Sequence, residues 1–231
     1  MTTRTPAIPE CHGEEDTATR LSDRPAPTRL PAHRRRRQLL DVAVEVFADR
    51  GYHGTSMEGV AEAAGVTKPV LYQHFSSKRG LYLELLDDVG SRLVDAVTTS
   101  LAAASGPRHQ VEAGFAAYFR FVARERHAFR LLFGSGARGE EEFADAVRQV
   151  EDRMADAIAV LIDADVGAEH RQIVGYGIVG LAEVTSRHWV SVHDDDKGGE
   201  ASLEEAARLA GYVTELAWGG LRAVHRGVTE T

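Results

Sequence analysis

The sequence predicts an all-α protein, and three observations support this fold class. From residue 32 onward, apolar residues recur at helical spacing, and the alternation that is typical of strands is missing. Five of the seven prolines lie in residues 1–31, and between residues 32 and 226 only Pro69 and Pro107 remain. Residues 1–31 also contain few large apolar side chains, so we expect them to form a disordered arm.

The helical part begins with two predicted helices. The first covers about residues 32–50, where apolar residues repeat on one face, and Gly51 is placed to end it in a left-handed conformation. The second begins with a capping box, in which Thr55 caps the helix and Glu58 reaches back, and it ends at Gly65.

Two more helices follow without a long connection. Thr67 is expected to cap a third helix over residues 68–75, where Pro69 is tolerated because it lies in the first turn. Ser76 is expected to cap a fourth helix over residues 77–104. Further helical patterns are predicted over residues 108–125, 126–134, 139–163 and 168–190, and from Ser202 to the C-terminal region, with a loop over residues 191–201.

Charge is distributed unevenly along the chain, whose formal net charge is -8. Residues 34–80 carry eight Lys/Arg and five Asp/Glu, whereas residues 81–231 carry 15 and 25. An acidic protein would repel nucleic acid over most of its surface, and a basic module at one end avoids that conflict. The pattern therefore favours nucleic-acid binding confined to the N-terminal part.

Several classes of protein are disfavoured by the sequence. No apolar run approaches the ~20 residues that a membrane span needs, and the N-terminus lacks a signal-peptide core, so we expect a cytoplasmic protein without membrane contact. The single cysteine, Cys11, excludes an intramolecular disulfide. No nucleophile with a nearby base and no phosphate-binding loop is found, so we expect no catalytic residue and no cofactor. His188, His193 and Asp194–Asp196 are interpreted as solvated residues, and no metal site is expected.

The second and third predicted helices form a helix-turn-helix pattern within the basic segment. Gly65 is the small residue at the turn, and Lys68, Gln73 and His74 form a polar edge on the second helix. The residues expected to lock the two helices together are Val60, Ala61, Val66 and Leu71. The N-terminal part of such a second helix enters the DNA major groove, where side chains distinguish base pairs.

The order of short motifs in this region resembles the DNA-binding region of the TetR family of bacterial repressors. The matching motifs are Gly51–Ser56 (GYHGTS), Val60–Thr67 (VAEAAGVT), Leu71–Phe75 (LYQHF) and Ser77–Lys78, within residues 34–85. The resemblance implies a three-helix DNA-binding domain over residues 32–80 and a helical ligand-binding and dimerisation domain over residues 81–231. It further implies a homodimer that represses transcription from a palindromic operator and is released by a small-molecule effector.

The same resemblance implies which residues contact double-stranded operator DNA. Tyr72, His74 and Lys78 match positions that hold phosphates in the family, and Lys68 and Gln73 match positions that face bases. The full expected set is Arg36, Arg37, Thr55, Ser56, Thr67, Lys68, Pro69, Val70, Tyr72, Gln73, His74 and Lys78. Alternatives remain open, because the arginine run could be a solvated charge cluster, Tyr72 could be a core residue, and Pro69 and Val70 could be neutral surface.

The C-terminal part contains aromatic and apolar residues that could line an effector cavity. The candidates are Phe115, Tyr118, Phe119, Phe129, Phe133, Met154 and Tyr176. Each could instead be an ordinary core residue. An apolar lining favours a hydrophobic effector, and a fatty-acyl or acyl-CoA compound would fit, because some family members that regulate lipid metabolism look similar around Lys68 and Pro69.

Helical glycines indicate where the chain is approached closely. Gly175, Gly177 and Gly180 each cost about 1 kcal/mol of helix propensity relative to alanine, so close contact with another helix, or with a ligand, should offset that cost. In the family the last two long helices usually form the dimer interface. The interface candidates are Gly177, Gly180, Trp189, Val213 and Trp218.

Two other functional interpretations remain open at this point. A helical ligand-binding or sequestering protein could retain a vestigial DNA-binding module. A DNA-binding activator could work without any ligand, and a fully packed C-terminal domain would favour it.

Overall fold

The computed structural model describes residues 31–134, 140–162, 166–193 and 200–226, and within these ranges it contains helices and no strand. The helices are α1 (Ala32–Gly54), α2 (Met57–Ala63), α3 (Lys68–His74), α4 (Lys78–Ala103), α5 (Pro107–Arg124), α6 (Arg126–Phe133), α7 (Glu141–Ala159), α8 (Ala168–Val192) and α9 (Glu200–Arg226). The predicted all-α fold class is confirmed over these residues. Except for Pro31, the expected arm of residues 1–31 lies outside the described residues, as do Asp194–Asp196.

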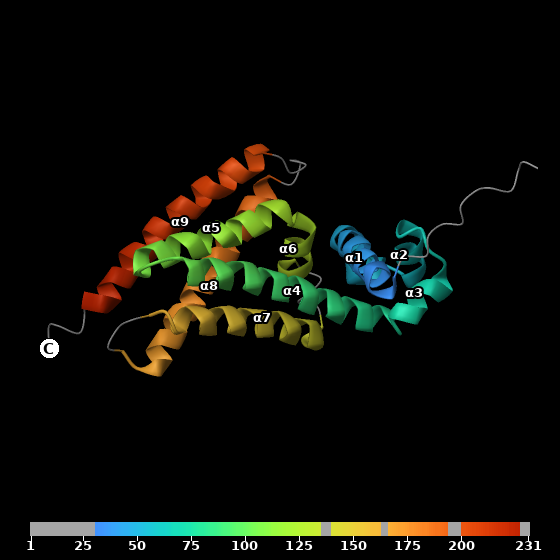
Figure 1. Cartoon of the computed structure of the whole chain (residues 1–231), viewed down its shortest axis with the longest axis horizontal. Coiled ribbons are helices and arrows are strands. Elements are labelled where there is room, and N and C mark those ends of the chain that lie inside the picture. The colour runs from blue at the N-terminus through green and yellow to red at the C-terminus, as the bar shows by residue number, and fades with distance from the viewer. Residues whose placement is uncertain (1–30, 135–139, 163–165, 194–199, 227–231) are drawn as a thin grey trace, which may run out of the picture.

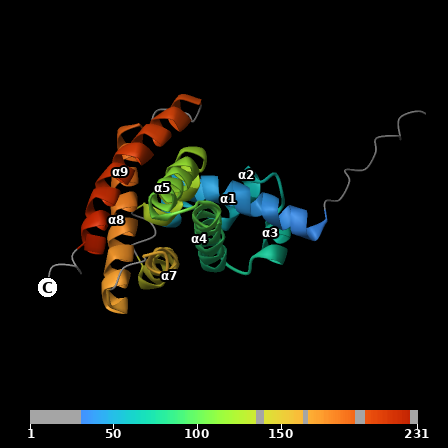
Figure 2. The same ribbon diagram turned by 60° about the vertical axis from the view of Figure 1, so that its left-hand side comes forward.

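The helices form two bundles that share α4. Helices α1, α2 and α3 gather at one end of the molecule, and α4 runs from that end into the larger bundle (Figure 1). Helices α8 and α9 lie side by side at the opposite end in both ribbon views (Figure 2). None of the described helices combines the length and the apolar character that crossing a membrane requires.

The N-caps of two helices lie one residue beyond the predicted positions. Ser56 caps α2 by accepting from Gly59 N at 3.0 Å, and Ser77 caps α4 by accepting from Gly80 N at 3.0 Å. Thr55 instead turns inward, is 3% exposed, and donates to the carbonyl of Gly51 at 2.8 Å. The predicted capping roles of Thr55 and Ser76 are therefore wrong, because in each case the following serine provides the oxygen that the first turn needs.

The two ends of the predicted C-terminal helices also need correction. Ser202 does not cap the last helix, which begins at Glu200, and its hydroxyl accepts from Arg126 Nη2 at 3.0 Å. Helix α8 runs to Val192 and thus takes up the start of the predicted loop. In α1, Gly51 has φ +68, so the helix breaks there as predicted, but one more helical turn follows to Gly54.

Close helix packing in the larger bundle depends on two glycines. A Cβ atom built on Gly90 of α4 would overlap the side chain of Val150 on α7. A Cβ atom on Gly175 of α8 would lie 2.6 Å from the carbonyl oxygen of Ala155 on α7. Close approach of α7 thus explains Gly175, as the sequence predicted, whereas a Cβ on Gly177 or Gly180 would meet no atom within 4 Å.

An aromatic cluster joins the two bundles. The ring of Tyr82 on α4 lies 5.0 Å from that of Tyr52 on α1 and 4.7 Å from that of Phe143 on α7. Burial raises the pKa of Tyr82 to about 12, so its hydroxyl stays protonated at neutral pH. Phe143 is fully buried, which shows that the start of α7 is sealed against the end of the smaller bundle.

Candidate functional site

One face of α3 is exposed at the end of the molecule. Lys68, Pro69, Tyr72 and Gln73 are exposed on this short helix, whereas Leu71 is fully buried against the rest of the small bundle. Tyr72 is 44% exposed, which rules out its alternative interpretation as a core residue. The exposed residues follow helical spacing, so they form one continuous edge that another molecule can contact.

The residues that flank α3 differ in how accessible they are. Thr67 is exposed, and its side chain makes no capping hydrogen bond, so its hydroxyl is available to a ligand. Ser56 is exposed but is used as a cap, and Thr55 is buried. Thr55 therefore supports the α1–α2 turn from within and cannot contact DNA by its side chain.

Lys78 holds the connection between α1 and α2. Its Nζ donates to the carbonyl of Tyr52 at 2.9 Å and to that of Thr55 at 3.0 Å, and it lies 4.3 Å from the centre of the Tyr52 ring. These contacts use two of its three protons on backbone carbonyls. Lys78 is thus a structural clamp within the small bundle, and one of its three protons remains available to contact a phosphate.

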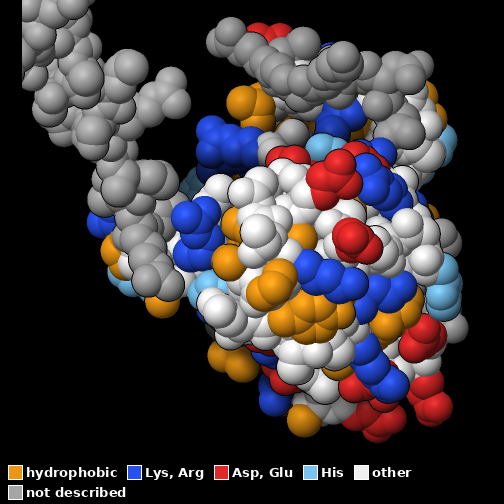
Figure 3. Space-filling model, turned by 90° about the vertical axis from the view of Figure 1, so that its right-hand side faces the viewer, with side chains coloured by type: hydrophobic (Ala, Val, Ile, Leu, Met, Phe, Trp, Pro, Cys, Tyr) orange, Lys and Arg blue, Asp and Glu red, His pale blue; other side chains and the backbone are white. Residues whose placement is uncertain are grey.

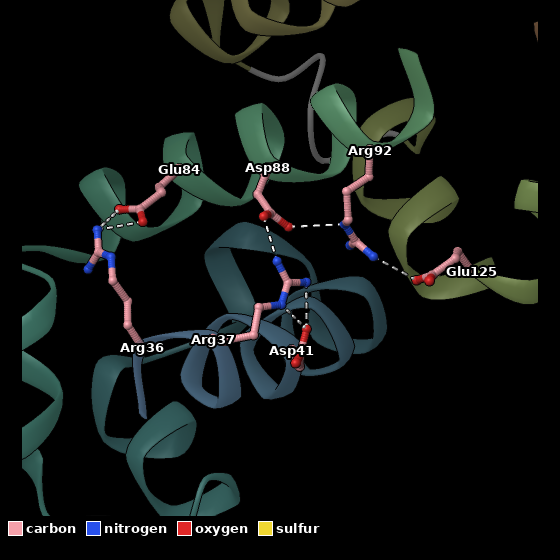
Figure 4. A network of polar contacts seen from close by, with 7 residues as sticks. All are labelled: Arg36, Arg37, Asp41, Glu84, Asp88, Arg92 and Glu125. Atoms are coloured by element: carbon pink, nitrogen blue, oxygen red, sulfur yellow. Dashed lines mark hydrogen bonds and ion pairs between the residues drawn. The ribbon is translucent and has the colours of Figure 1, made fainter. Parts of the chain in front are cut away.

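Arg36 and Arg37, expected at the DNA, are bound to α4 in this structure (Figure 4). Arg36 pairs with Glu84 at 2.5 Å and donates to the carbonyl of His74 at 2.8 Å. Arg37 pairs with Asp88 at 2.6 Å and also with Asp41 on its own helix. Because carboxylates already neutralise both guanidinium groups, the two arginines fasten α1 to α4 rather than present free charge to phosphates.

The network continues along α4 toward the larger bundle. Asp88 also accepts from Arg92 Nε at 3.2 Å, and Arg92 Nη1 lies 3.2 Å from a carboxylate oxygen of Glu125 (Figure 4). On another side, Asp49 of α1 lies 3.4 Å from His127 Nε2 and 3.4 Å from Arg130 Nη2, both on α6. Polar contacts therefore tie the small bundle to α4 and to α6.

The end of the molecule that carries α3 has a mixed charge. Figure 3 looks onto this end and shows Lys and Arg side chains spread over the face, with acidic side chains among them and along one margin. On α3 itself the charge is positive, because Lys68 is exposed and its nearest carboxylate, that of Glu58, is 4.0 Å away.

A cavity lies inside the larger bundle, between α4, α5, α7, α8 and α9. Its open volume, counted together with its mouth, is about 950 Å³. The lining is almost entirely apolar: Leu93, Val97, Leu101, Pro107, Val111, Gly114, Phe115, Phe133, Val150, Met154, Ile158, Leu161, Ile162, Ile178, Val179, Ala182, Trp218 and Leu221. The polar lining residues are Gln110, Tyr118, Glu151 and Glu183.

Four of the seven residues predicted to line a cavity do so, namely Phe115, Tyr118, Phe133 and Met154. The other three predictions are wrong. Phe119 and Phe129 are buried in the core outside the cavity. Tyr176 is 43% exposed on α8, and its hydroxyl donates to Asp152 at 2.5 Å, so it lies on the outside of the bundle.

Much of the lining was missed by the sequence reasoning. Leu93, Val97 and Leu101 recur every four residues along α4, and this stripe was a signal for a buried face, although not for a hollow one. Glu183 was a second signal in the sequence, because it is a carboxylate within a mostly apolar helix. In the structure its side chain is only 7% exposed. Trp218 was predicted at the dimer interface, and the structure places it among the residues that line the cavity.

The outer faces of α8 and α9 expose apolar residues that no described part of the protomer covers. Ile173, Val184, Tyr212 and Leu216 are 57–66% exposed. Gly177 and Gly219 are exposed on the same two helices, and a Cβ on either would meet open space.

Two further interface candidates are not available on these outer faces. Trp189 is 7% exposed and lies 5.3 Å from the Arg126 guanidinium, so it packs inside the protomer. Val213 is 4% exposed and belongs to the hydrophobic core. Both lie on the two helices that were predicted to form the interface, but their side chains are buried in the core of the protomer.

The small bundle, with an exposed second helix after a tight turn at Gly65, defines a helix-turn-helix DNA-binding protein. Residues 39–85 match the family model described as "Bacterial regulatory proteins, tetR family", and residues 107–213 match "Tetracyclin repressor-like, C-terminal domain". The chain belongs to the TetR family of transcriptional regulators and is not an enzyme.

Three known proteins illustrate the similarity. The chain is 37% identical to the HTH-type transcriptional activator FasR of Mycolicibacterium smegmatis over 198 residues, which cover 85% of this chain and 87% of that protein. A TetR-like transcriptional regulator from Rhodococcus sp. RHA1 superposes with a TM-score of 0.67 at 28% identity, covering 84% of this chain and 99% of that one. FadR from Bacillus subtilis, solved in complex with stearoyl-CoA, superposes with a TM-score of 0.66 at 16% identity, covering 78% and 96%.

Proposed function

We propose that this regulator binds a palindromic operator as a homodimer and leaves it when a hydrophobic, acyl-type effector fills the cavity. One observation carries the proposal: α4 is a single helix of 26 residues that begins beside α3 and lines the cavity with Leu93, Val97 and Leu101. A ligand that displaces the far half of α4 must also move its near half, to which α1 is tied through Arg36 and Arg37. The two sites are therefore coupled through one rigid element.

A dimer is supported by the uncovered outer faces of α8 and α9. Exposed apolar residues on two neighbouring helices are typical of a surface that another protein chain covers. Small residues such as Gly177 and Gly219 would let the helices of two protomers approach closely. A two-fold symmetric dimer would then place two copies of α3 about one DNA turn, ~34–36 Å, apart, as a palindromic operator requires.

The acyl chemistry is supported by the lining of the cavity. Its apolar walls suit an alkyl chain, and no Lys or Arg lines it among the described residues. FadR from Bacillus subtilis shares this fold and holds stearoyl-CoA.

Whether the protein represses or activates transcription depends on where its operator lies relative to the promoter. Release of DNA would end repression at one promoter and activation at another, so the predicted repressor role stays a prediction. A bacterial regulator that binds operator DNA works in the cytoplasm, where the chromosome lies.

The proposal is tested by selecting bound sequences from random duplex DNA, with and without palmitoyl-CoA. Recovery of a palindrome that is lost when palmitoyl-CoA is added would support it. Coupling is reciprocal, so the selected operator should weaken palmitoyl-CoA binding by the same factor. Failure to enrich any sequence would instead support a ligand-sequestering protein, and enrichment that no acyl ligand alters would support a ligand-independent regulator.

Two substitutions on α3 should separate affinity from sequence preference. Lys68→Ala removes an exposed cation, so it should weaken binding to every duplex and reduce the salt slope of log K by about 1, in addition to the change in base preference expected at the position that Lys68 faces. Gln73→Ala should instead change the preferred bases, because an amide can read adenine through paired hydrogen bonds. Titration of fluorescent duplexes at several salt concentrations measures both effects.

Arg108→Ala is the matched control, since Arg108 is exposed at the start of α5, in the larger bundle, and its ion-pair partner among the described residues is Glu112. It should leave the salt slope unchanged. If Gln73→Ala and the control show the same sequence preference, α3 does not read bases through Gln73.

A further inference from the structure

Tyr118, which lines the cavity, carries a hydroxyl that an alkyl chain cannot satisfy. The hydroxyl of Tyr118 is out of contact with solvent, and no group among the described residues meets it in hydrogen-bonding geometry. The neighbouring Ser186 donates its own hydrogen to the carbonyl of Ala182. A buried hydroxyl without a partner destabilises the protein that carries it, so a group that supplies the missing acceptor would be bound preferentially.

The charged residues that line the cavity are both acidic. Glu151 comes from α7 and Glu183 from α8, and the cation of Arg187, which lies 3.4 Å from Glu183, does not line the cavity. A free fatty acid would bring a third carboxylate into this low-dielectric space, where like charges repel strongly. The lining thus disfavours an anionic head group inside the cavity, whereas the two carboxylates do not repel a neutral polar group.

Tyr118 is present as a hydrogen-bond donor. Burial raises the pKa of its hydroxyl, and the nearby Ser186 side chain lowers it by less. Among the charged neighbours, Glu183 and Glu151 raise this pKa and Arg187 lowers it. The hydroxyl therefore keeps its proton at neutral pH and offers that proton to an oxygen acceptor.

We propose that the cavity selects an effector whose chain carries a neutral oxygen, and that Tyr118 is the specificity-determining residue that donates a hydrogen bond to this oxygen. The inference rests on the proposed function, because it takes the cavity as the effector site. The oxygen belongs either to the thioester carbonyl of an acyl-CoA or to a hydroxyl on the chain, and the free carboxylate is rejected.

The test compares four ligands that share a 16-carbon chain: palmitoyl-CoA, 1-hexadecanol, palmitate and hexadecane, each below its aggregation concentration. Binding to the full-length protein is followed by intrinsic fluorescence, because Trp218 lines the cavity, in a Trp189→Phe background that removes the second tryptophan. Tyr118→Phe should lower the affinity for palmitoyl-CoA, for 1-hexadecanol or for both by about threefold to tenfold, and it should leave the affinity for hexadecane unchanged. Which of the two ligands responds identifies the source of the oxygen.

The thermal midpoint of the ligand-free protein provides a second readout, and it should change in the direction opposite to the affinity. Tyr118→Phe removes the unsatisfied hydroxyl from the ligand-free protein, so its thermal midpoint should rise while its affinity for the oxygenated ligand falls. A substitution that merely damaged packing would lower both. Tyr176→Phe is the matched control, since the Tyr176 hydroxyl bonds to Asp152 outside the cavity, and it should change none of the four affinities.

Glu183→Gln tests the rejection of carboxylates. It keeps the shape of the side chain and removes one negative charge, so palmitate should bind about tenfold more tightly, whereas 1-hexadecanol should bind as before. Equal binding of all four ligands by Tyr118→Phe and its parent would overturn the inference and leave the acyl-effector proposal standing. If none of the four ligands binds the parent protein, the acyl-effector proposal falls and this inference falls with it.

Discussion

Replacing Leu216 by arginine should convert the proposed dimer into monomers and lower the affinity for a palindromic operator by about 100-fold or more. Leu216 is 66% exposed in the protomer, on the same outer face of α9 as Tyr212. An arginine there is harmless to the isolated protomer, but at a helix–helix interface its charge would lose water without gaining a partner. A monomer reads one half-site only, so the gain from joint binding is lost. Light scattering gives the mass, and titration with the selected duplex gives the affinity.

Val160→Arg provides the control for this prediction. Val160 is 84% exposed at the end of α7, outside the faces of α8 and α9, so the same change there should leave both the mass and the operator affinity intact. Circular dichroism should show full helical content in both variants. A Leu216→Arg protein that remains dimeric would show that the protomers meet through a different surface.

Replacing Gly175 by alanine should destabilise the protein by about 2 kcal/mol or more, although alanine is the better helix former. The new Cβ would lie 2.6 Å from the carbonyl oxygen of Ala155, and a backbone atom inside α7 cannot move away by changing a rotamer. Helices α7 and α8 would have to separate, and both line the cavity. Chemical denaturation at one fixed protein concentration measures the change in the free energy of unfolding.

Gly211→Ala shows the opposite case on α9. A Cβ at Gly211 would meet no atom within 4 Å, so the substitution should gain up to about 1 kcal/mol from helix propensity. A stabilising Gly175→Ala change would mean that α7 and α8 are not packed as closely in solution as in this structure.

Local chemistry explains why so much of the N-terminal bundle was predictable. The turn at Gly65 has φ +64, and the apolar residues beside it alternate with exposed ones at helical spacing. The motif can therefore be recognised from a segment of about 25 residues. The exposed edge of α3 follows from the same periodicity. The caps were misplaced by one residue because Thr55–Ser56 and Ser76–Ser77 each offer two adjacent hydroxyls. Packing turns Thr55 inward, whereas Ser76 and Ser77 are both exposed.

The candidate DNA contacts show where periodicity stops being informative. Four consecutive arginines indicate positive charge but not its partners, and the carboxylates that neutralise Arg36 and Arg37 come from Glu84 and Asp88, about 50 residues later in the chain. Lys78 likewise matches a phosphate-binding position, yet its amino group is held by two carbonyls of the α1–α2 connection. These assignments required the tertiary structure.

By itself the sequence determined the helical class, the helix-turn-helix with its exposed second helix and the apolar character of the C-terminal bundle, because each depends on residues within a few helical turns of one another. Only the tertiary structure decided which apolar stripes enclose a cavity, which meet another helix and which stay uncovered. Tyr176, Trp189 and Tyr118 are all aromatic residues within predicted helices, but they lie on the surface, in the core and at the cavity. The physical reason is that helical periodicity shows which side of a helix is apolar, whereas the neighbour that covers this side comes from a distant part of the chain.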